Sequence, residues 1–257
     1  MKSISPFSKL PPLLAIPSAL IVLFCSIQFF TFTCYAQTSH HQRTLNNNNL
    51  LKETRIINGI EAPPSRYPYI ASLQVGGHHF CGATIIAPDI ALTAGHCSGA
   101  EQDLDIYRVV VGRYDLDDTS KGRSIKMIQE VLHPLYDEDS IDNDFNVVLL
   151  AEPIREEEGI GMIQLNRDAS VPEVGAATTV MGWGDTKPKE SEVETSNILL
   201  ETEVFAVSNE QCEMSKGTVE TGGFGQVFTD MNGKITDNML CAWAQDTDGC
   251  QGDSGGP

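Results

Sequence analysis

From Tyr69 onward the chain consists of short runs rich in β-branched and aromatic residues, and no long amphipathic helical pattern separates them. The runs lie at residues 69–75, 80–87, 107–111, 125–132, 147–150, 177–181 and 198–207. Turn residues such as Gly76-Gly77 and Pro88-Asp89 lie between them. Short strands separated by turn signals are typical of a β-barrel or a β-sandwich, so the predicted fold class is all-β.

Residues 1–36 have the pattern of a secretory signal peptide. Lys2 and Lys9 lie near the start, and an apolar run covers residues 13–32. The run is followed by Cys34-Tyr35-Ala36, in which the small residues Cys34 and Ala36 lie three and one positions before a possible cleavage site. We expect this leader to be cleaved and the mature protein to be secreted and extracellular. Because the apolar run is long enough to cross a bilayer, an uncleaved signal anchor is the alternative.

Residues 37–55 are polar and rich in asparagine, and they contain too little apolar surface to build a core. We interpret them as a flexible pro-segment. The segment ends at Arg55, directly before the apolar Ile56, which is a plausible processing site. The third expected region, residues 56–257, is the folded domain.

The net charge limits the partners that the domain can bind. The chain has 17 basic and 35 acidic side chains, and five basic and one acidic residue precede Ile56. The domain therefore carries 12 basic and 34 acidic groups, a formal net charge of −22. Nucleic acid requires a basic face, so the composition argues against that partner. An acidic, solvated surface is compatible with cationic partners.

The last ten residues, 248–257, form a glycine-rich loop around a single serine, Ser254. Glycine loses more backbone entropy on ordering than any other residue, so such a loop needs a reason to be ordered. One reason is that backbone N–H groups must point at a reacting oxygen while the serine stands clear of its neighbours. The alternative is a solvent-exposed linker.

The domain contains four histidines, and His96 differs from the others. His78 and His79 follow two glycines and are interpreted as a hairpin tip, and His133 precedes a proline in a loop. His96 lies beside Cys97 in an otherwise apolar context. It is the candidate base, with a purely structural histidine as the alternative.

Asp144 opens an apolar strand, residues 145–150. An aspartate at the mouth of a buried strand can lie against an imidazole N–H, where it fixes the tautomer and stabilises the imidazolium. A strand-capping aspartate is the alternative, and Asp142 is a rival two positions earlier.

Four motifs occur in order: Leu92-Thr93-Ala94-Gly95-His96-Cys97, Asn143-Asp144, Gly182-Trp183-Gly184 and Gly252-Asp253-Ser254-Gly255-Gly256-Pro257. Together they resemble the trypsin/chymotrypsin family of serine proteases, over residues 55–257. The chain order His, Asp, Ser fits that family and differs from the subtilisin and α/β-hydrolase orders. The resemblance implies two antiparallel six-stranded β-barrels, the second incomplete in this chain.

The resemblance also implies the roles of single residues in a serine endopeptidase. Ser254 would be the nucleophile, His96 the general base and then acid, and Asp144 the residue that orients His96. The backbone N–H groups of Gly252 and Ser254 would form the oxyanion hole.

Two further roles follow from the same resemblance. Cleavage after Arg55 would free Ile56, whose new ammonium group would pair with Asp253 and convert a zymogen into the active form. Asp248, six positions before Ser254, would form the floor of the specificity pocket and select Arg or Lys substrates. A plain turn aspartate is the alternative for Asp248.

The resemblance implies that Cys81 pairs with Cys97 and that Cys212 pairs with Cys241. Between the second pair we expect a long mobile loop at the glycine-rich residues 217–233. Cys250 is left without a partner, because family members continue past the final motif and supply that cysteine there. We therefore expect the sequence to be a fragment, with a natural and inactive truncation as the alternative.

We expect no cofactor and no metal. Arg113 and Arg123 lie where a calcium loop of this family would carry carboxylates, and a cation cannot ligate calcium. The expected partners are protein or peptide substrates, an activating protease and protein inhibitors, with a membrane only if residues 13–32 remain as an anchor. The alternative function is a catalytically inactive homologue that acts as a binding protein.

Overall fold

The computed structural model describes residues 59–99, 104–156, 159–186, 195–221, 225–244 and 252–257. The predicted processing residues Arg55 and Ile56 lie outside these ranges, as do Asp248 and Cys250. Within the described ranges, no helix has the length and apolar character needed to cross a membrane.

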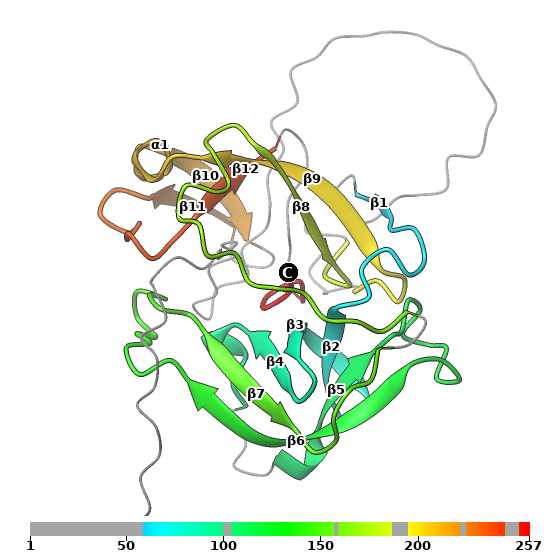
Figure 1. The fold of residues 1–257 in the computed structure, drawn as a ribbon. Helices are drawn as coiled ribbons and strands as arrows, with labels where there is room; N and C mark the ends of the chain where they lie inside the picture. Colours follow the sequence, from blue (N-terminus) through cyan, green and yellow to red (C-terminus); the bar gives the residue numbers. More distant parts are fainter. Residues whose placement is uncertain (1–58, 100–103, 157–158, 187–194, 222–224, 245–251) are drawn as a thin grey trace, which may run out of the picture.

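Six antiparallel strands close into a barrel in the order β2-β3-β4-β7-β6-β5, drawn in the lower half of Figure 1. Their bounds are β2 Ile70–Val75, β3 His78–Ala87, β4 Ile90–Thr93, β5 Tyr107–Val111, β6 Arg123–Leu132 and β7 Asn146–Leu150. The predicted turn Gly76-Gly77 joins β2 to β3, and both glycines have positive φ, 58° and 88°. Such angles suit glycine and match the twist of a tight hairpin. Two 3-10 turns, η1 Gly95–Cys97 and η2 Leu104–Ile106, lie between β4 and β5.

The barrel core follows from the alternation of side chains along its strands. In β6, Ile125 and Met127 are buried while Ser124 and Lys126 are exposed. The core also contains Leu73, Ile85, Val109, Val111 and Val148, each fully buried. At about 25 cal/mol per Å² of apolar surface, burial of this kind is the main source of stability.

A second sheet system lies above the barrel in the view of Figure 1. It contains β1 Ile60–Glu61, β8 Ala177–Gly182, β9 Leu200–Val207 and β12 Cys241–Trp243, with β9 paired antiparallel to the other three. The one short α-helix of the described chain, α1 Asn209–Glu213, follows β9. A closed first barrel and a second sheet system confirm the predicted all-β, double-barrel class; among the described strands, those of the first system alone close into a barrel.

The prediction of a mobile loop at residues 217–233 was wrong. Most of its described residues belong to two strands, β10 Lys216–Thr221 and β11 Gly225–Asp230, which form a hairpin paired from Lys216↔Asp230 to Thr221↔Gly225. The Cys212–Cys241 disulfide, predicted correctly, closes its base with the two Cα atoms 6.3 Å apart.

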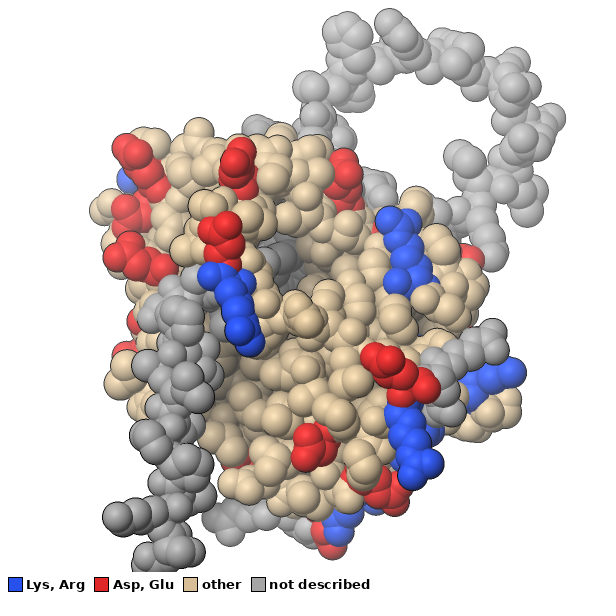
Figure 2. All heavy atoms as spheres, in the orientation of Figure 1, with Lys and Arg blue, Asp and Glu red and all other residues tan. Residues whose placement is uncertain are grey.

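Charged groups are unevenly distributed on the face seen in Figure 2. Acidic side chains lie over the upper left, where Figure 1 places α1 and the β10–β11 hairpin, and basic side chains lie apart from one another. This face therefore offers no continuous basic surface of the kind that nucleic acid requires.

Candidate active site

His96 and Asp144 are brought together by the pairing of two barrel strands. His96 lies in η1, directly after β4, and Asp144 lies two residues before β7. β4 and β7 are antiparallel neighbours, with Thr93 opposite Asn146. The residues just beyond this pair therefore meet at one end of the barrel.

The carboxylate of Asp144 is directed at His96. Its Oδ1 accepts a hydrogen bond from the backbone N–H of His96 at 2.8 Å, and its Oδ2 lies 2.7 Å from Nδ1 of the ring. Asp144 is only 3% exposed, and a carboxylate this far from water needs such donors. The contact assigns the proton to Nδ1 and leaves Nε2 as the acceptor. An imidazole held in this way can take a proton at Nε2.

Asp142, the rival aspartate, has different partners. Its Oδ1 accepts from the hydroxyl of Thr236 at 2.7 Å and from Nδ2 of Asn238 at 3.1 Å. Of the two aspartates, Asp144 is therefore the one that contacts His96.

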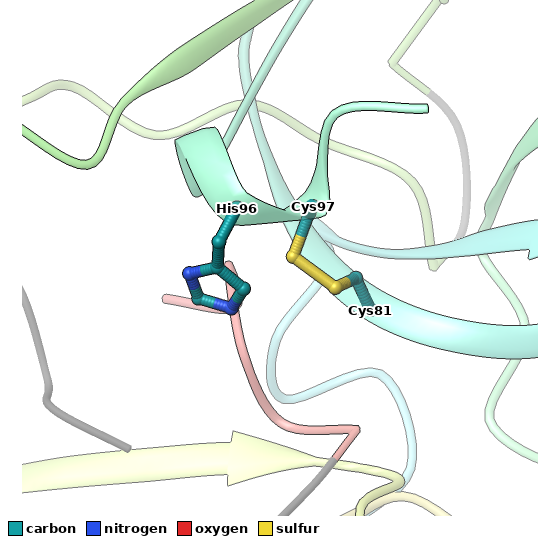
Figure 3. A group of neighbouring side chains, drawn as sticks. All are labelled: Cys81, His96 and Cys97. Atoms are coloured by element: carbon teal, nitrogen blue, oxygen red, sulfur yellow. A yellow bond between two sulfur atoms is a disulfide. The ribbon is translucent and has the colours of Figure 1, made fainter. Parts of the chain in front are cut away.

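The Cys81–Cys97 disulfide, predicted correctly, holds the histidine turn to β3 (Figure 3). Ligand atoms of Cys81, Cys97 and His96 lie within 4.8 Å of one another, which is the only metal-type grouping among the residues described. Zinc binds thiolates, and both sulfurs are committed to the disulfide. We conclude that this is a histidine beside a cystine and not a metal centre.

Ser254 belongs to the loop of residues 252–257, which lies between the two sheet systems (Figure 1). Its carbonyl oxygen accepts from the backbone N–H of Gly82 at 2.8 Å and lies 3.7 Å from Sγ of Cys97. Oγ of Ser254 and Nε2 of His96 are both buried, and neither forms a hydrogen bond. Hydrogen bonds between a nucleophile and its base are often loose without substrate, so this geometry is compatible with catalysis.

Asp253 is buried beside Ser254, at 9% exposure. Its Oδ1 accepts from the backbone N–H of Gly184 at 2.7 Å. A Cβ at Gly182 or Gly184 would overlap this carboxylate, so only glycine permits the close approach. The Gly182-Trp183-Gly184 motif therefore acts as a cradle for Asp253.

His79 lies in the predicted hairpin, one residue beyond the pair Val75↔His78 that closes the turn, but its contacts were not predicted. Nε2 of His79 lies 2.9 Å from the carbonyl oxygen of Gly252, and Nδ1 lies 2.8 Å from Oγ of Ser72. The ring also packs edge-on against Trp183, with centroids 5.7 Å apart. Burial lowers the pKa of His79, and the hydrogen bond to the Gly252 carbonyl offsets part of that effect.

Tyr136 packs against the histidine turn near Asp144. A Cβ at Gly95 would lie 3.0 Å from Cδ2 of Tyr136 and 3.1 Å from Oδ1 of Asp144, so these groups pack tightly around the histidine turn. Burial, together with the charge of Asp144, raises the pKa of Tyr136 to about 12. Tyr136 therefore remains a neutral phenol across the physiological pH range.

The chain is similar to known proteins in sequence and in fold. Residues 56–257 match the sequence model of the family described as Trypsin. The chain is 34% identical to "Trypsin 5G1" of Aedes aegypti over 244 residues, which cover 92% of this chain and 83% of that protein. It is also 34% identical to a trypsin of Simulium vittatum over 210 residues, 79% of this chain and 77% of that protein.

A similar fold occurs among solved structures. Neuropsin, a serine protease expressed in the limbic system of mouse brain, superposes with a TM-score of 0.64 at 27% sequence identity. The superposition covers 78% of this chain and 80% of neuropsin.

Proposed function

Because this chain belongs to the trypsin family of serine proteases, we propose that it is a serine endopeptidase with His96, Asp144 and Ser254 as its catalytic triad. The observation that supports the proposal best is the bond from the buried Asp144 to Nδ1 of His96. It leaves Nε2 of His96 available as a base, and both this nitrogen and Oγ of Ser254 are buried without a hydrogen-bond partner.

In the acylation step, Oγ of Ser254 attacks the carbonyl carbon of the scissile peptide bond while its proton passes to Nε2 of His96. The resulting imidazolium is stabilised by Asp144. Collapse of the tetrahedral intermediate breaks the C–N bond, and Nε2 returns the proton to the leaving amine. In the deacylation step, water attacks the acyl ester while its proton passes to Nε2 of His96. Collapse of the second intermediate releases the carboxylic acid product, and Ser254 regains its proton.

The negative oxygen of each tetrahedral intermediate would be bound by the backbone N–H groups of Gly252 and Ser254. Gly252 has φ of +98°, a backbone conformation that favours glycine. Loss of one such donor typically costs about 100- to 1000-fold in turnover.

Activation would follow cleavage after Arg55. The new ammonium group of Ile56 would pair with Asp253, whose side chain is buried beside Ser254. Pairing raises the pKa of the ammonium above its usual value of about 8, so the pair is complete below that value and is lost as pH rises through the raised pKa. Activity of the cleaved chain should therefore fall at alkaline pH.

We propose a preference for Arg or Lys before the scissile bond, with the carboxylate of Asp248 as the partner of the substrate cation. In Asp248→Ser a neutral side chain replaces the carboxylate, so the preference for Arg substrates over Phe substrates should be lost. Cleavage of both substrates at equal rates by the unchanged protein would contradict the assignment.

We also propose that the protein is secreted as a zymogen. Two disulfides support this, because such bonds persist in oxidising compartments. The leader and pro-segment expected at residues 1–36 and 37–55 would be removed in turn.

The deciding experiment is covalent labelling of Ser254. The Arg55-cleaved chain is treated with a fluorophosphonate, which reacts with activated serines, and the labelled peptide is identified by mass spectrometry. We expect a label on Ser254, no label in Ser254→Ala, and a rate about 10⁴-fold lower in Asp144→Asn. A folded, cleaved chain that takes no label would favour the non-catalytic binding homologue.

A further inference from the structure

Asp142 connects the barrel to the second sheet system. Its Oδ1 accepts from the Thr236 hydroxyl at 2.7 Å, and Nδ2 of Asn238 lies 3.1 and 3.3 Å from its two oxygens. Asp142 lies just before β7 of the barrel, and its two partners lie just before β12 of the second system. These bonds span 94 and 96 positions of sequence.

The backbone around Asp142 has an unfavourable conformation. In the part of the chain that the structure describes, three residues other than glycine have positive φ, and two of them flank Asp142. They are Ile141 at +56° and Asn143 at +53°. Asparagine tolerates this region, whereas a β-branched residue such as isoleucine rarely adopts it. Such a turn persists only where its surroundings hold it.

The same turn carries local hydrogen bonds that meet at Asp142. The backbone N–H of Asp137 donates to the Asp142 carbonyl at 3.0 Å. Nδ2 of Asn143 lies 3.1 Å from both Oδ2 of Asp142 and the carbonyl of Leu135. Asp142 is therefore where bonds within the turn meet bonds from the second sheet system.

We propose that Asp142 is a positioning residue for the triad. Its bonds to Thr236 and Asn238 hold the unfavourable turn that leads into Asp144, and so fix Asp144 and His96 relative to Ser254. The need arises because His96 and Asp144 belong to the barrel, whereas Ser254 lies on the loop between the two systems (Figure 1). The inference rests on the proposed endopeptidase function. A misplacement of about 1 Å can cost about 100-fold in rate.

The rate test uses Asp142→Ala in the Arg55-cleaved chain. We expect fluorophosphonate labelling of Ser254 to slow by about 100-fold, and by less in Thr236→Val. The double variant Asp142→Ala/Thr236→Val should be no slower than Asp142→Ala, because both changes remove the same Asp142–Thr236 hydrogen bond. Ser208→Ala is the matched control, since it removes the cap of α1 in the same sheet system and touches neither the turn nor the triad.

The second readout is the low-field proton resonance of Nδ1 of His96, which reports the charge-assisted bond to Asp144. We expect it to move or broaden in Asp142→Ala and to stay in place in Ser208→Ala. The exchanged pair Asp142→Asn/Asn238→Asp keeps one carboxylate and one amide at the contact. It should restore both the resonance and most of the labelling rate.

The two proposals fail in different ways. Labelling of the unchanged protein together with an unaltered rate in Asp142→Ala overturns the positioning role and leaves the proposed function intact. If the unchanged protein takes no label, the proposed function fails, and the resonance alone decides the role of Asp142. A resonance that does not change in Asp142→Ala overturns the inference in either case.

Discussion

Nε2 of His79 donates a hydrogen bond to the carbonyl oxygen of Gly252 at 2.9 Å, across 173 positions of sequence. A carbonyl oxygen can only accept, so Nε2 carries the proton and Nδ1 accepts from the hydroxyl of Ser72. Nε2 of Gln74 in turn donates to Ser72 Oγ at 3.2 Å. A chain of buried donors and acceptors thus connects the barrel to the loop that carries Ser254.

Replacement of His79 should disturb the proposed oxyanion hole. His79→Ala removes the donor that fixes the Gly252 carbonyl, and therefore loosens the backbone of the loop. We expect labelling of Ser254 to slow by about tenfold, less than for direct loss of an oxyanion donor. His79→Gln keeps an N–H donor and should recover most of the rate. Equal rates in His79→Ala and the unchanged chain would show that this bond does not support the loop.

The lowered pKa of His79 predicts a loss of stability in acid. In the unfolded chain the group has its usual pKa of about 6.5, whereas burial lowers the pKa in the folded state. As pH falls below about 6.5, the unfolded chain binds a proton that the folded chain does not, so the free energy of unfolding decreases. Urea unfolding at several pH values should show this decrease, and it should be smaller in His79→Gln.

The sequence was sufficient for the parts of the site that depend on local motifs. His96 was singled out by its place beside Cys97, Asp144 by its place at the start of an apolar strand, and the structure places them in contact. The all-β class was predicted from the short strand-like runs, and the two disulfides were predicted from the family resemblance. The roles of Asp248, Arg55 and Ile56 stay predictions, since these residues lie outside the described ranges.

His79 was missed because its role depends on a residue far away in the sequence. Alternation along β3 gave no signal, because the strand is buried at every position from Cys81 to Ile85. The hairpin was missed because its glycines suggested a loop, although β10 and β11 pair over their full lengths.

The ion pair between Arg66 and Glu201 should contribute to stability. Nη1 of Arg66 lies 3.0 Å from Oε1 of Glu201, whose side chain is 9% exposed. Arg66→Ala would leave a buried carboxylate without its cation, but Arg66 is itself 52% exposed, so we expect a loss of only about 1–2 kcal/mol. The double variant Arg66→Ala/Glu201→Gln should recover part of this loss. Urea denaturation gives the unfolding midpoint of the unchanged protein and of both variants. An unchanged midpoint in Arg66→Ala would show that the ion pair does not contribute to stability.

The β10–β11 hairpin should be dispensable for folding. Among the described strands it forms a sheet of its own, and a two-stranded hairpin is marginally stable by itself. The backbone N–H of Met231 donates to the Ser215 carbonyl at 3.1 Å, so an Asn-Gly turn can replace residues 216–230. We expect the shortened chain to keep its unfolding midpoint and its rate of Ser254 labelling. A slower rate with an unchanged midpoint would instead assign the hairpin a role at the active site.

Gly184 provides the most direct test of the cradle around Asp253. In Gly184→Ala the new methyl group would overlap the Asp253 carboxylate, so the carboxylate must leave the position in which it accepts from the Gly184 N–H. Because Asp253 is bonded in sequence to Ser254, its displacement moves the serine and the loop backbone together. We expect labelling of Ser254 in the Arg55-cleaved chain to fall by about 100-fold. Gly217→Ala is the matched control, since nothing lies within 4 Å of a Cβ at that position. If both variants react at the rate of the unchanged chain, the position of Asp253 does not govern the reactivity of Ser254.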